Sequence, residues 1–410
     1  MMRDKELYTQ ILGIQAPWEV SDIELDLKAG EVKVYVEQKP GTKQACPRCG
    51  ASCPGYDKRR RQWRHLDTCQ LKTLLVADLP RVQCAEHGVV SVHVPWSEPG
   101  SGFTALYEAL VIDWLKEAST QAVSRQLSLS WNAIDGIMQR AVNRGLARRQ
   151  VESPKRIGVD ETSFRKGHDY VTIVSAGGKV LHVSDERKKA SLKSYYDTLS
   201  DSQKTEIESV SMDMWPAYIK ATLEDIPDAG RKIAFDKFHV AKYLGEAVDK
   251  VRKQEHKALM CEGWEDLKGS KYDWLTNLGN LSRKRQRSFK LLRESTLKTA
   301  RAWAIKDLAM RLWNYVSRTW AEKRWKQWLS WAFRSRLEPV RKVARTIKEH
   351  LWGILNAIIL KANNRASESI NSRIKTIKIR SRGFRNKARY KNAIYFHLGG
   401  LDLYPDGVVR

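Results

Sequence analysis

Long apolar runs are absent from this chain of 410 residues. No stretch reaches the roughly eighteen consecutive apolar residues that a membrane-spanning helix requires, so no membrane span is predicted. The first residues, MMRDKELYTQILGI, carry charges and lack the apolar core and small-residue cleavage site of a secretory signal. No repeat or low-complexity tract stands out. We therefore expect a cytoplasmic protein that has no membrane partner.

Acidic residues are scarce relative to basic ones. Seventy-three Lys and Arg stand against 47 Asp and Glu, which gives a formal net charge of +26. Such an excess favours a polyanionic partner, and nucleic acid is the commonest, although ribosome-associated and membrane-surface proteins share this balance. Hydrophobic residues make up 42% of the chain, so it can bury real cores. Its length suits two or three compact units.

Cysteine is also sparse, and its placement is uneven. Five of the six cysteines fall between Cys46 and Cys84. In a reducing compartment such a cluster more often binds metal than forms disulfides. The spacing C-x2-C followed by C-x2-H suits tetrahedral zinc and gives the ligand set Cys46, Cys49, Cys84 and His87. Competing ligands are Cys53, Cys69 and His65, and free thiols in a β-rich module are the remaining alternative.

Changes of pattern divide the chain into regions. A Pro/Gly/Ser break at 95–102 separates a β-rich segment from three short helices, of which the second and third are joined by the tight turn of a helix-turn-helix. Short apolar strands then alternate with helices, as in a mixed α/β sheet. The predicted regions are 1–97 (β-rich zinc module), 98–152 (helix-turn-helix), 153–245 with 346–398 (catalytic core), 246–345 (basic, Trp-rich helical insertion) and 399–410 (tail).

Two aspartates each close a short apolar strand: Asp160 ends IGVD and Asp213 ends VSMD. An aspartate at this position is often a turn or helix cap. If the strand ends meet, however, the two carboxylates lie side by side and repel unless a divalent cation neutralises them. Hard oxygen ligands suit magnesium or manganese. Two such ions about 4 Å apart can activate a water or a 3′-hydroxyl and stabilise the leaving oxygen of a phosphodiester.

A third carboxylate is predicted at Glu368, on a basic helix that begins near Thr346 and ends near Lys378. A lone helix glutamate is usually solvated, but an acid among so many cations is unusual unless a metal ion offsets it. Helical spacing puts it on one polar side of the helix. That side holds Lys361, Asn364, Glu368, Asn371 and Lys375, with Ile370, Ile374 and Ile377 packed beneath.

The segment AFDKFHV adds Asp236 and His239 as further candidates near a strand end. His239 could contact phosphate or assist proton transfer, and a satisfied structural histidine is the alternative. We favour a catalytic role for His239. Glu161, next to Asp160, is expected to point to the opposite face of its strand and is not chosen as a metal ligand.

At these residues the sequence resembles the DDE transposases of bacterial insertion sequences, specifically the ISL-three family. The matching stretches run in the family's order over nearly the whole chain. They are CPRCG (46–50), WRHLD (63–67), IGVDETSF (157–164), MDMWPAY (212–218), FDKFHV (235–240) and NRASESINSRIK followed by RSRGFRN. One departure is CAEHG, which supplies Cys84 and His87 where the family usually has a second cysteine pair.

The resemblance implies a multidomain α+β protein with a ribonuclease-H-like core and a helical insertion before the helix of the last acid. It implies DNA cleavage at element ends and strand transfer into a target, with Asp160, Asp213 and Glu368 as the DDE triad that holds Mg2+ or Mn2+. Two rivals remain. One is a zinc-ribbon and helix-turn-helix regulator with an inactive core, and the other is a structure-specific nuclease that cuts without joining.

The expected partner is double-stranded DNA, both the terminal inverted repeats and the target, and the synapsis of two ends favours a homodimer. The third helix of the helix-turn-helix region is expected to enter the major groove. Tryptophans of the insertion could stack on an unpaired base, although most helix tryptophans belong to cores. The residues predicted to contact DNA are Arg140, Arg144, Arg148, Arg149, Trp215, Lys361, Asn364, Asn371, Lys375, Arg380, Arg382, Arg385 and Lys387.

Overall fold

The computed structural model describes residues 4–150, 153–165, 167, 169–265, 267–276, 278–362 and 365–408, with only the backbone of Arg365. The predicted DNA contact Asn364 lies outside these residues. The chain forms two compact units, one of residues 1–149 with 378–410 and the other of residues 150–377. The division at residue 150 falls beside the boundary that the sequence predicts at 152.

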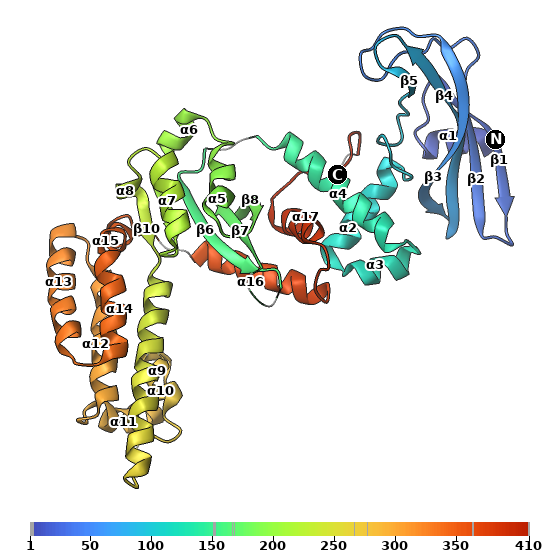
Figure 1. Ribbon diagram of the computed structural model, residues 1–410. Coiled ribbons are helices and arrows are strands. Elements are labelled where there is room, and N and C mark those ends of the chain that lie inside the picture. Colours follow the sequence, from blue (N-terminus) through green and yellow to red (C-terminus); the bar gives the residue numbers. More distant parts are fainter. Residues whose placement is uncertain are drawn as a thin grey trace. The chain divides into compact units, whose positions relative to one another are not determined.

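A twisted β-sheet opens the first unit. Helix α1 (Asp4–Ile11) precedes strands β1 (Trp18–Asp26), β2 (Glu31–Gln38), β3 (Gly55–Thr68), β4 (Leu71–Cys84) and β5 (Gly88–Ser91). The strand order is β1-β2-β4-β3, with β5 also paired to β4 (Figure 1). Alternate residues of β2 are buried, as a strand with one solvated face requires. Three tryptophans of this core, Trp18, Trp63 and Trp96, make edge-to-face contacts.

The helix-turn-helix region consists of α2 (Ala105–Glu117), α3 (Thr120–Leu127) and α4 (Trp131–Arg148). The side chains of Thr104, Ser119 and Ser130 cap their N-termini by accepting backbone N–H groups of the first turns. Ser128 adopts a left-handed conformation (φ 52°) and makes the tight turn between α3 and α4. The tight turn predicted between the second and third helices of this region is confirmed.

Helix α17 (Lys387–Leu398) and the segment after it belong to the first unit, whereas the sequence prediction placed 346–398 in the catalytic core. The reason is close packing against α4. Arg389 pairs with Asp135 of α4 at 3.0 Å. Gly145 approaches Leu401 so closely that a Cβ at position 145 would lie 2.6 Å from the Leu401 Cβ.

The second unit contains a five-stranded mixed sheet. Its strands are β6 (Arg156–Ser163), β7 (Tyr170–Ala176), β8 (Lys179–Asp185), β9 (Ser209–Met212) and β10 (Ile233–Phe235). The order is β10-β9-β6-β7-β8, in which β6, β7 and β8 are antiparallel and β9 and β10 run parallel to β6. The connecting helices are α5 (Lys189–Tyr196), α6 (Asp201–Glu206), α7 (Pro216–Asp225) and α8 (Ala229–Lys232).

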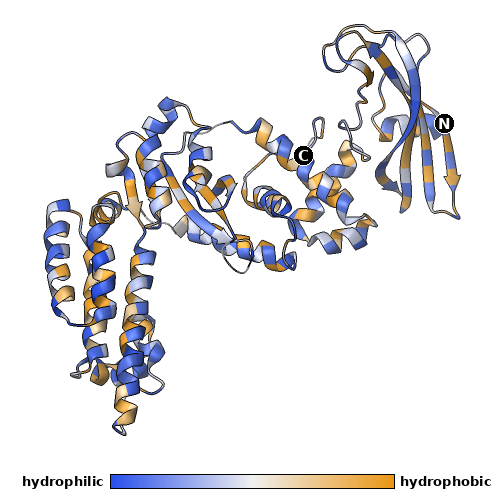
Figure 2. Cartoon of the chain, in the orientation of Figure 1, coloured by the Kyte–Doolittle hydropathy of each residue, from blue (hydrophilic) through white to orange (hydrophobic). Residues whose placement is uncertain are grey.

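A helical segment lies between β10 and the helix that carries Glu368. It comprises α9 (Lys237–Cys261), α10 (Lys271–Leu275), α11 (Arg283–Arg293), α12 (Lys298–Arg311), α13 (Arg318–Arg334), α14 (Glu338–Glu349) and α15 (Leu351–Ile359), and α16 (Arg365–Arg380) follows. Figure 2 shows apolar stripes alternating with hydrophilic ones along these helices. Trp274, Trp325 and Trp328 are fully buried, so their rings serve the core, whereas Trp264 and Trp320 are exposed.

Helix α15 joins this segment to the sheet. Gly353 lies so close to Phe235 of β10 that a Cβ there would fall 2.4 Å from the ring. In the part of the chain that the structure describes, no helix combines the length and apolar character of a membrane crossing.

Candidate active site and metal centre

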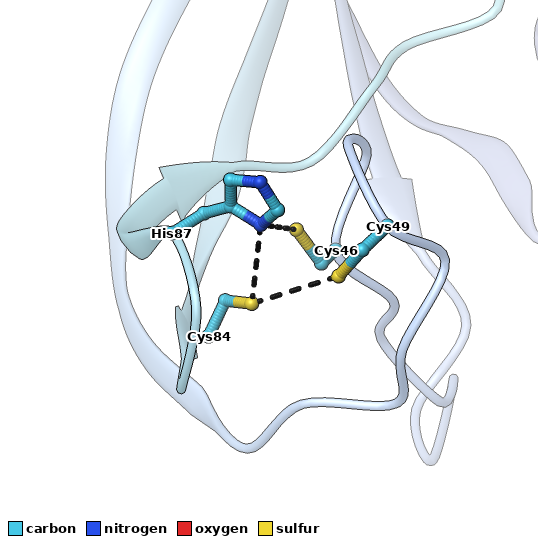
Figure 3. Close-up of side chains that lie close together, drawn as sticks. All are labelled: Cys46, Cys49, Cys84 and His87. Carbon is cyan, nitrogen blue, oxygen red and sulfur yellow. Dashed lines mark hydrogen bonds between the residues drawn. The ribbon is translucent and has the colours of Figure 1, made fainter.

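Four side chains converge at one end of the N-terminal sheet (Figure 3). Cys46 and Cys49 come from the loop between β2 and β3, and Cys84 and His87 flank the turn between β4 and β5. Their ligand atoms all lie within 4.8 Å of one another. The Sγ atoms of Cys49 and Cys84 are 3.7 Å apart, and His87 Nδ1 is 3.7 Å from Cys46 Sγ and 3.6 Å from Cys84 Sγ.

These separations match the edges of a zinc-centred tetrahedron. With Zn–S near 2.3 Å and Zn–N near 2.1 Å, tetrahedral angles place sulfurs about 3.8 Å apart and sulfur and nitrogen about 3.6 Å apart. The ligand set Cys3His predicted from spacing is therefore assembled in the structure, and His87 offers Nδ1. Backbone N–H groups of His87 and Glu86 lower the pKa of the Cys84 thiol to about 7, which favours the thiolate that binds zinc.

Of the competing ligands, Cys53 borders the cluster and its thiol interacts with Cys84, but it is not one of the four mutually close ligands. Cys53 Sγ is 3.3 Å from the carbonyl oxygen of Ala51, and Cys69 is exposed. His65 is buried and joins β3 to the start of α2 through a 2.9 Å hydrogen bond between its Nδ1 and Thr104 Oγ1. The WRHLD stretch is thus a joint between the zinc module and the helix-turn-helix.

In the second unit, three aspartates stand level on neighbouring parallel strands. Asp213 and Asp236 directly follow β9 and β10, whereas Asp160 lies within β6, which continues to Ser163, so the prediction that Asp160 closes its strand is wrong. Gly158 of β6 pairs with Ser211 of β9, so two residues further Asp160 is level with Asp213. Phe235 of β10 pairs with Met212, so Asp236 is also level with Asp213. Neighbouring strands are about 4.8 Å apart. This register makes Asp160 and Asp213 level on adjacent strands, and the Asp213 carboxylate acts electrostatically on Asp160.

Asp160 lies in a largely buried environment. Burial raises the pKa of its carboxyl group to about 6. The Glu161 backbone N–H, 2.8 Å from Asp160 Oδ1, opposes this rise, and the Glu161 and Asp213 carboxylates add to it while His239 lowers it. Asn371 Nδ2 donates to Asp160 Oδ2 at 2.6 Å. A cation close to Asp160 would lower the electrostatic cost of ionising its carboxyl group.

Helix α9 brings two polar side chains to Asp213. His239 Nδ1 is 3.6 Å from Asp213 Oδ1, in the first turn of the helix. Tyr243 lies one turn further, and burial followed by the Asp213 carboxylate raises its pKa to about 12. Sequence reasoning found His239 but missed Tyr243. The i, i+4 spacing of the two residues in FHVAKY is the signal that would have found it.

Helix α16 is fixed against the sheet by its buried face. Ile370, Ile374 and Ile377 are buried as predicted, and the buried hydroxyls of Ser367 and Ser175 are 3.1 Å apart. Glu368 is half-buried, one turn before Asn371 on the same face. Asn371, predicted as a DNA contact, instead bonds Asp160.

Several oxygens around this edge of the sheet are buried without a hydrogen-bond partner among the described residues. They are Asp236 Oδ2, Glu161 Oε2 and Asn371 Oδ1. Buried oxygens that lack a donor are costly, and cations satisfy them. Within the described residues, the only His, Cys, Asp and Glu group tight enough to hold a metal ion as it stands is the Cys3His cluster.

An arginine that the sequence did not single out borders the site. Arg187 pairs with Glu161 Oε1 at 2.9 Å, and its guanidinium lies 3.9 Å from the ring centroid of Trp215. The Trp215 indole N–H donates to the Arg187 carbonyl at 2.9 Å. One face of Trp215, a predicted DNA contact, is therefore covered by Arg187. No local pattern announces this pair, because Glu161 and Arg187 are 26 residues apart.

The arginines of α4, predicted to face DNA, have their donors engaged within the first unit. Buried Glu108 accepts from Arg140 at 2.8 Å and from Arg144 at 3.4 Å. Arg144 also pairs with Glu98 at 3.1 Å and is itself buried.

The last two α4 arginines bind the segment after α17. Arg148 pairs with Asp402 at 2.9 Å, and Arg149 donates to the Gly399 carbonyl. Both are half-buried. The remaining predicted contacts are Lys387, which is half-buried, and the exposed residues Lys361, Lys375, Arg380, Arg382 and Arg385.

Comparison with known proteins matches this organisation in three consecutive segments. Residues 42–87 match the zinc-finger of transposase IS204/IS1001/IS1096/IS1165. Residues 92–142 match the helix-turn-helix domain of transposase family ISL3. Residues 157–394, more than half of the chain, match the ISL3 DDE family described as transposase.

Two characterised relatives are similar over almost their whole length. The transposase for insertion sequence element IS1557 of Mycobacterium tuberculosis (strain ATCC 25618 / H37Rv) is 27% identical over 420 residues, covering 94% of this chain and 93% of the relative. The transposase for insertion sequence element IS1001 of Bordetella parapertussis is 26% identical over 395 residues, covering 94% and 96%.

A zinc ribbon, a helix-turn-helix and a DDE domain in this order define a DNA-binding enzyme of the transposase class. The chain belongs to the ISL3 family of insertion-sequence transposases.

Proposed function

We propose that this transposase cuts and joins DNA through Asp160, Asp213 and Glu368, which together hold two divalent ions, Mg2+ or Mn2+. The core is ribonuclease-H-like, built from residues 153–245 and 346–398, with residues 246–345 as a helical insertion. When bound, the ions polarise the scissile phosphate and lower the pKa of the attacking water or 3′-hydroxyl. The opposing carboxylates hold them at the edge of the sheet.

The observation that carries this proposal is the register that sets Asp160 and Asp213 side by side. The hydrogen bond from Asn371 adds to it, because it holds α16, and with it Glu368, against β6. The buried, donorless oxygens of Asp236, Glu161 and Asn371 also suit cations. A cation held by Asp160, Asp213 and Glu368 would offset the repulsion between their carboxylates.

His239 has a separate task in this scheme. From 3.6 Å it orients Asp213, and in its charged form it attracts the scissile phosphate. Tyr243, held neutral by its raised pKa, covers the same side of Asp213.

The DNA partner is held by the first unit. The helix-turn-helix and the zinc module are proposed to bind the terminal inverted repeats, with exposed basic residues between Lys375 and Arg385 following the phosphate backbone. Pairing of two element ends requires two catalytic units, so a homodimer is the proposed assembly.

The test uses duplexes that end in the element's terminal repeat, with Mg2+ and the full-length protein. Asp160→Asn and Asp213→Asn are expected to lower cleavage at least 1000-fold, an order of magnitude typical for loss of a metal ligand, while repeat binding stays intact. Asp197→Asn, an exposed aspartate paired with Lys193, is the matched control. Normal cleavage by Asp160→Asn would contradict the assignment of Asp160 as a ligand of the catalytic metal ions. A product cut but never joined points to a nuclease instead.

A further inference from the structure

Helix α11, far from the strand ends of the second unit, carries an unusual charge pattern. Its sequence RKRQRSFKLLR holds six Lys and Arg in 11 residues and no acid. Figure 1 places it with α10 at the end of the helical segment away from the sheet. This surface, defined by Arg283, Lys284, Arg287 and Lys290, is called the α11 basic face below.

The four side chains of the α11 basic face are exposed and have no acidic partner among the described residues. The other two cations of the helix each face an acid, Arg285 near Asp273 at 3.5 Å and Arg293 near Glu294 at 3.8 Å. Two thirds of the positive charge on this helix is therefore unneutralised within the protein.

Elsewhere in the same segment basic and acidic residues are mixed, and several exposed cations pair with an acid within one or two turns. Such pairs are Lys268–Glu265, Arg311–Asp307, Lys326–Glu322 and Arg345–Glu338. A general need for solubility explains mixed charges of this kind but not a helix of one sign.

The pattern also opposes the stability of α11 itself. Arg283, Lys284 and Arg285 occupy the first turn, where the helix macrodipole disfavours positive charge. Arg283 and Arg287 are like charges at i, i+4, which destabilises a helix. Violations of local preference of this kind mark functional surfaces, because an external partner must compensate them.

Packing holds the helix in place despite its charge. Phe289, 1% exposed, makes edge-to-face contacts with Trp274 at 4.8 Å and Trp303 at 5.5 Å. Ser282 caps the N-terminus by accepting the Arg285 backbone N–H. The α11 basic face is thus presented on a rigid base. Tyr272, 63% exposed on adjacent α10, adds a flat ring beside it.

We propose that the α11 basic face binds the phosphate backbone of duplex DNA without regard to sequence, at a site separate from both the helix-turn-helix and the carboxylates. Four unpaired cations on one short helix suit several phosphates along a backbone, whose neutralisation releases counterions. Lys and Arg that contact only phosphates fix position and carry no sequence information. The DNA bound here is therefore target or flanking duplex rather than the terminal repeat.

The experiment measures binding of the full-length protein to a duplex that lacks the terminal repeat, across a series of KCl concentrations. The variant is Arg283→Ala/Lys284→Ala/Arg287→Ala/Lys290→Ala. Its salt dependence, the slope of log K against log [KCl], is expected to become shallower by about 3.6, near 0.9 for each of four lost phosphate contacts. Affinity at low salt is expected to fall at least tenfold, while cleavage of a short repeat-end duplex is unchanged.

A second variant with the same change of net charge is the control: Lys268→Ala/Arg311→Ala/Lys326→Ala/Arg345→Ala. Its slope is expected to change by less than 1, because those cations already have acidic partners. An equal change in both variants, or an unchanged slope in the α11 variant, overturns the proposal. Thermal unfolding verifies the fold, and the α11 variant is expected to be no less stable than the parent because repulsion is relieved. These results are independent of the Asp160→Asn outcome.

Discussion

Asn371 of α16 donates a hydrogen bond of 2.6 Å to Asp160 Oδ2, which ties a residue late in the chain to a strand 211 residues earlier. The oxygen of the same amide, Asn371 Oδ1, is buried and accepts no hydrogen bond from the described residues. Asn371 is therefore placed to orient Asp160 and, in the proposed metal site, to face a cation. Outer partners of metal-binding carboxylates commonly affect metal affinity as strongly as they affect rate.

Asn371→Ala is expected to raise the Mg2+ concentration needed for half-maximal cleavage by about 10- to 100-fold, because Asp160 loses its orienting donor. Mg2+ titration of repeat-end cleavage measures this directly. Ser372→Ala, at the next and exposed position of the same helix, is the control and should titrate like the parent. If Asn371→Ala weakens DNA binding and leaves the Mg2+ dependence unchanged, Asn371 contacts DNA as the sequence first suggested.

A pH dependence follows from His65. Burial, and then the charge of Arg64, lower its pKa from the ordinary 6.5 to about 4. Between these values the unfolded chain binds a proton that the folded chain does not, so stability is present above pH 6.5 and is lost as pH falls towards 4. The shift of about 2.5 corresponds to about 3 kcal/mol of unfolding free energy.

The check compares the free energy of unfolding at pH 7 and pH 5 for the parent and for His65→Gln, both saturated with zinc. The parent is expected to lose more stability on acidification than His65→Gln does, and the difference isolates His65. Identical losses would show that His65 is charged in the folded protein.

Zinc content tests the Cys3His cluster. Cys84→Ser removes a thiolate whose pKa is already lowered to about 7, and the protein is expected to retain no zinc after exchange into chelator-free buffer. Cys53→Ser is the matched control, since Cys53 lies outside the cluster, and it should keep one zinc per chain. Elemental analysis decides the outcome, and loss of zinc from Cys53→Ser would contradict the ligand set.

Glu108 is the buried anion that holds the helix-turn-helix arginines. Glu108→Ala leaves Arg140 and buried Arg144 without this partner and is expected to destabilise the first unit by about 3 kcal/mol. Denaturant unfolding followed by near-ultraviolet circular dichroism measures the change. Glu117→Ala removes an exposed acid from the same helix and should cost less than 1 kcal/mol, roughly the range of surface substitutions.

Much of the fold could be predicted because it follows local patterns. Ser119 and Ser130 are common N-cap residues, and they predict where α3 and α4 begin. The short apolar stretches that lead to Asp160 and Asp213 predict two strands, which are parallel in the structure. The division of the units was harder. Nothing local shows that α17 packs on α4, because the contact rests on Arg389 meeting Asp135 across 254 residues of sequence.

The sites show the same contrast. Cys46, Cys49, Cys84 and His87 were identified by spacing, since zinc ligands come in short pairs. The arginines of α4 were predicted to contact DNA from their charge and helical spacing. Which group each guanidinium binds in the fold, however, depends on acids distant in sequence, such as Glu108 and Asp402. Charge alone does not reveal which cations already have partners.

The docking of residues 387–404 on α4 has a consequence for how the protein is made. The helix-turn-helix emerges early from the ribosome, yet Arg148 and Gly145 acquire their neighbours only after Leu401 and Asp402 have been synthesised. The whole catalytic unit, residues 150–377, is translated in between. The packing of α4 is therefore completed only at the end of translation, when Arg148 gains its acidic partner and Gly145 its neighbour.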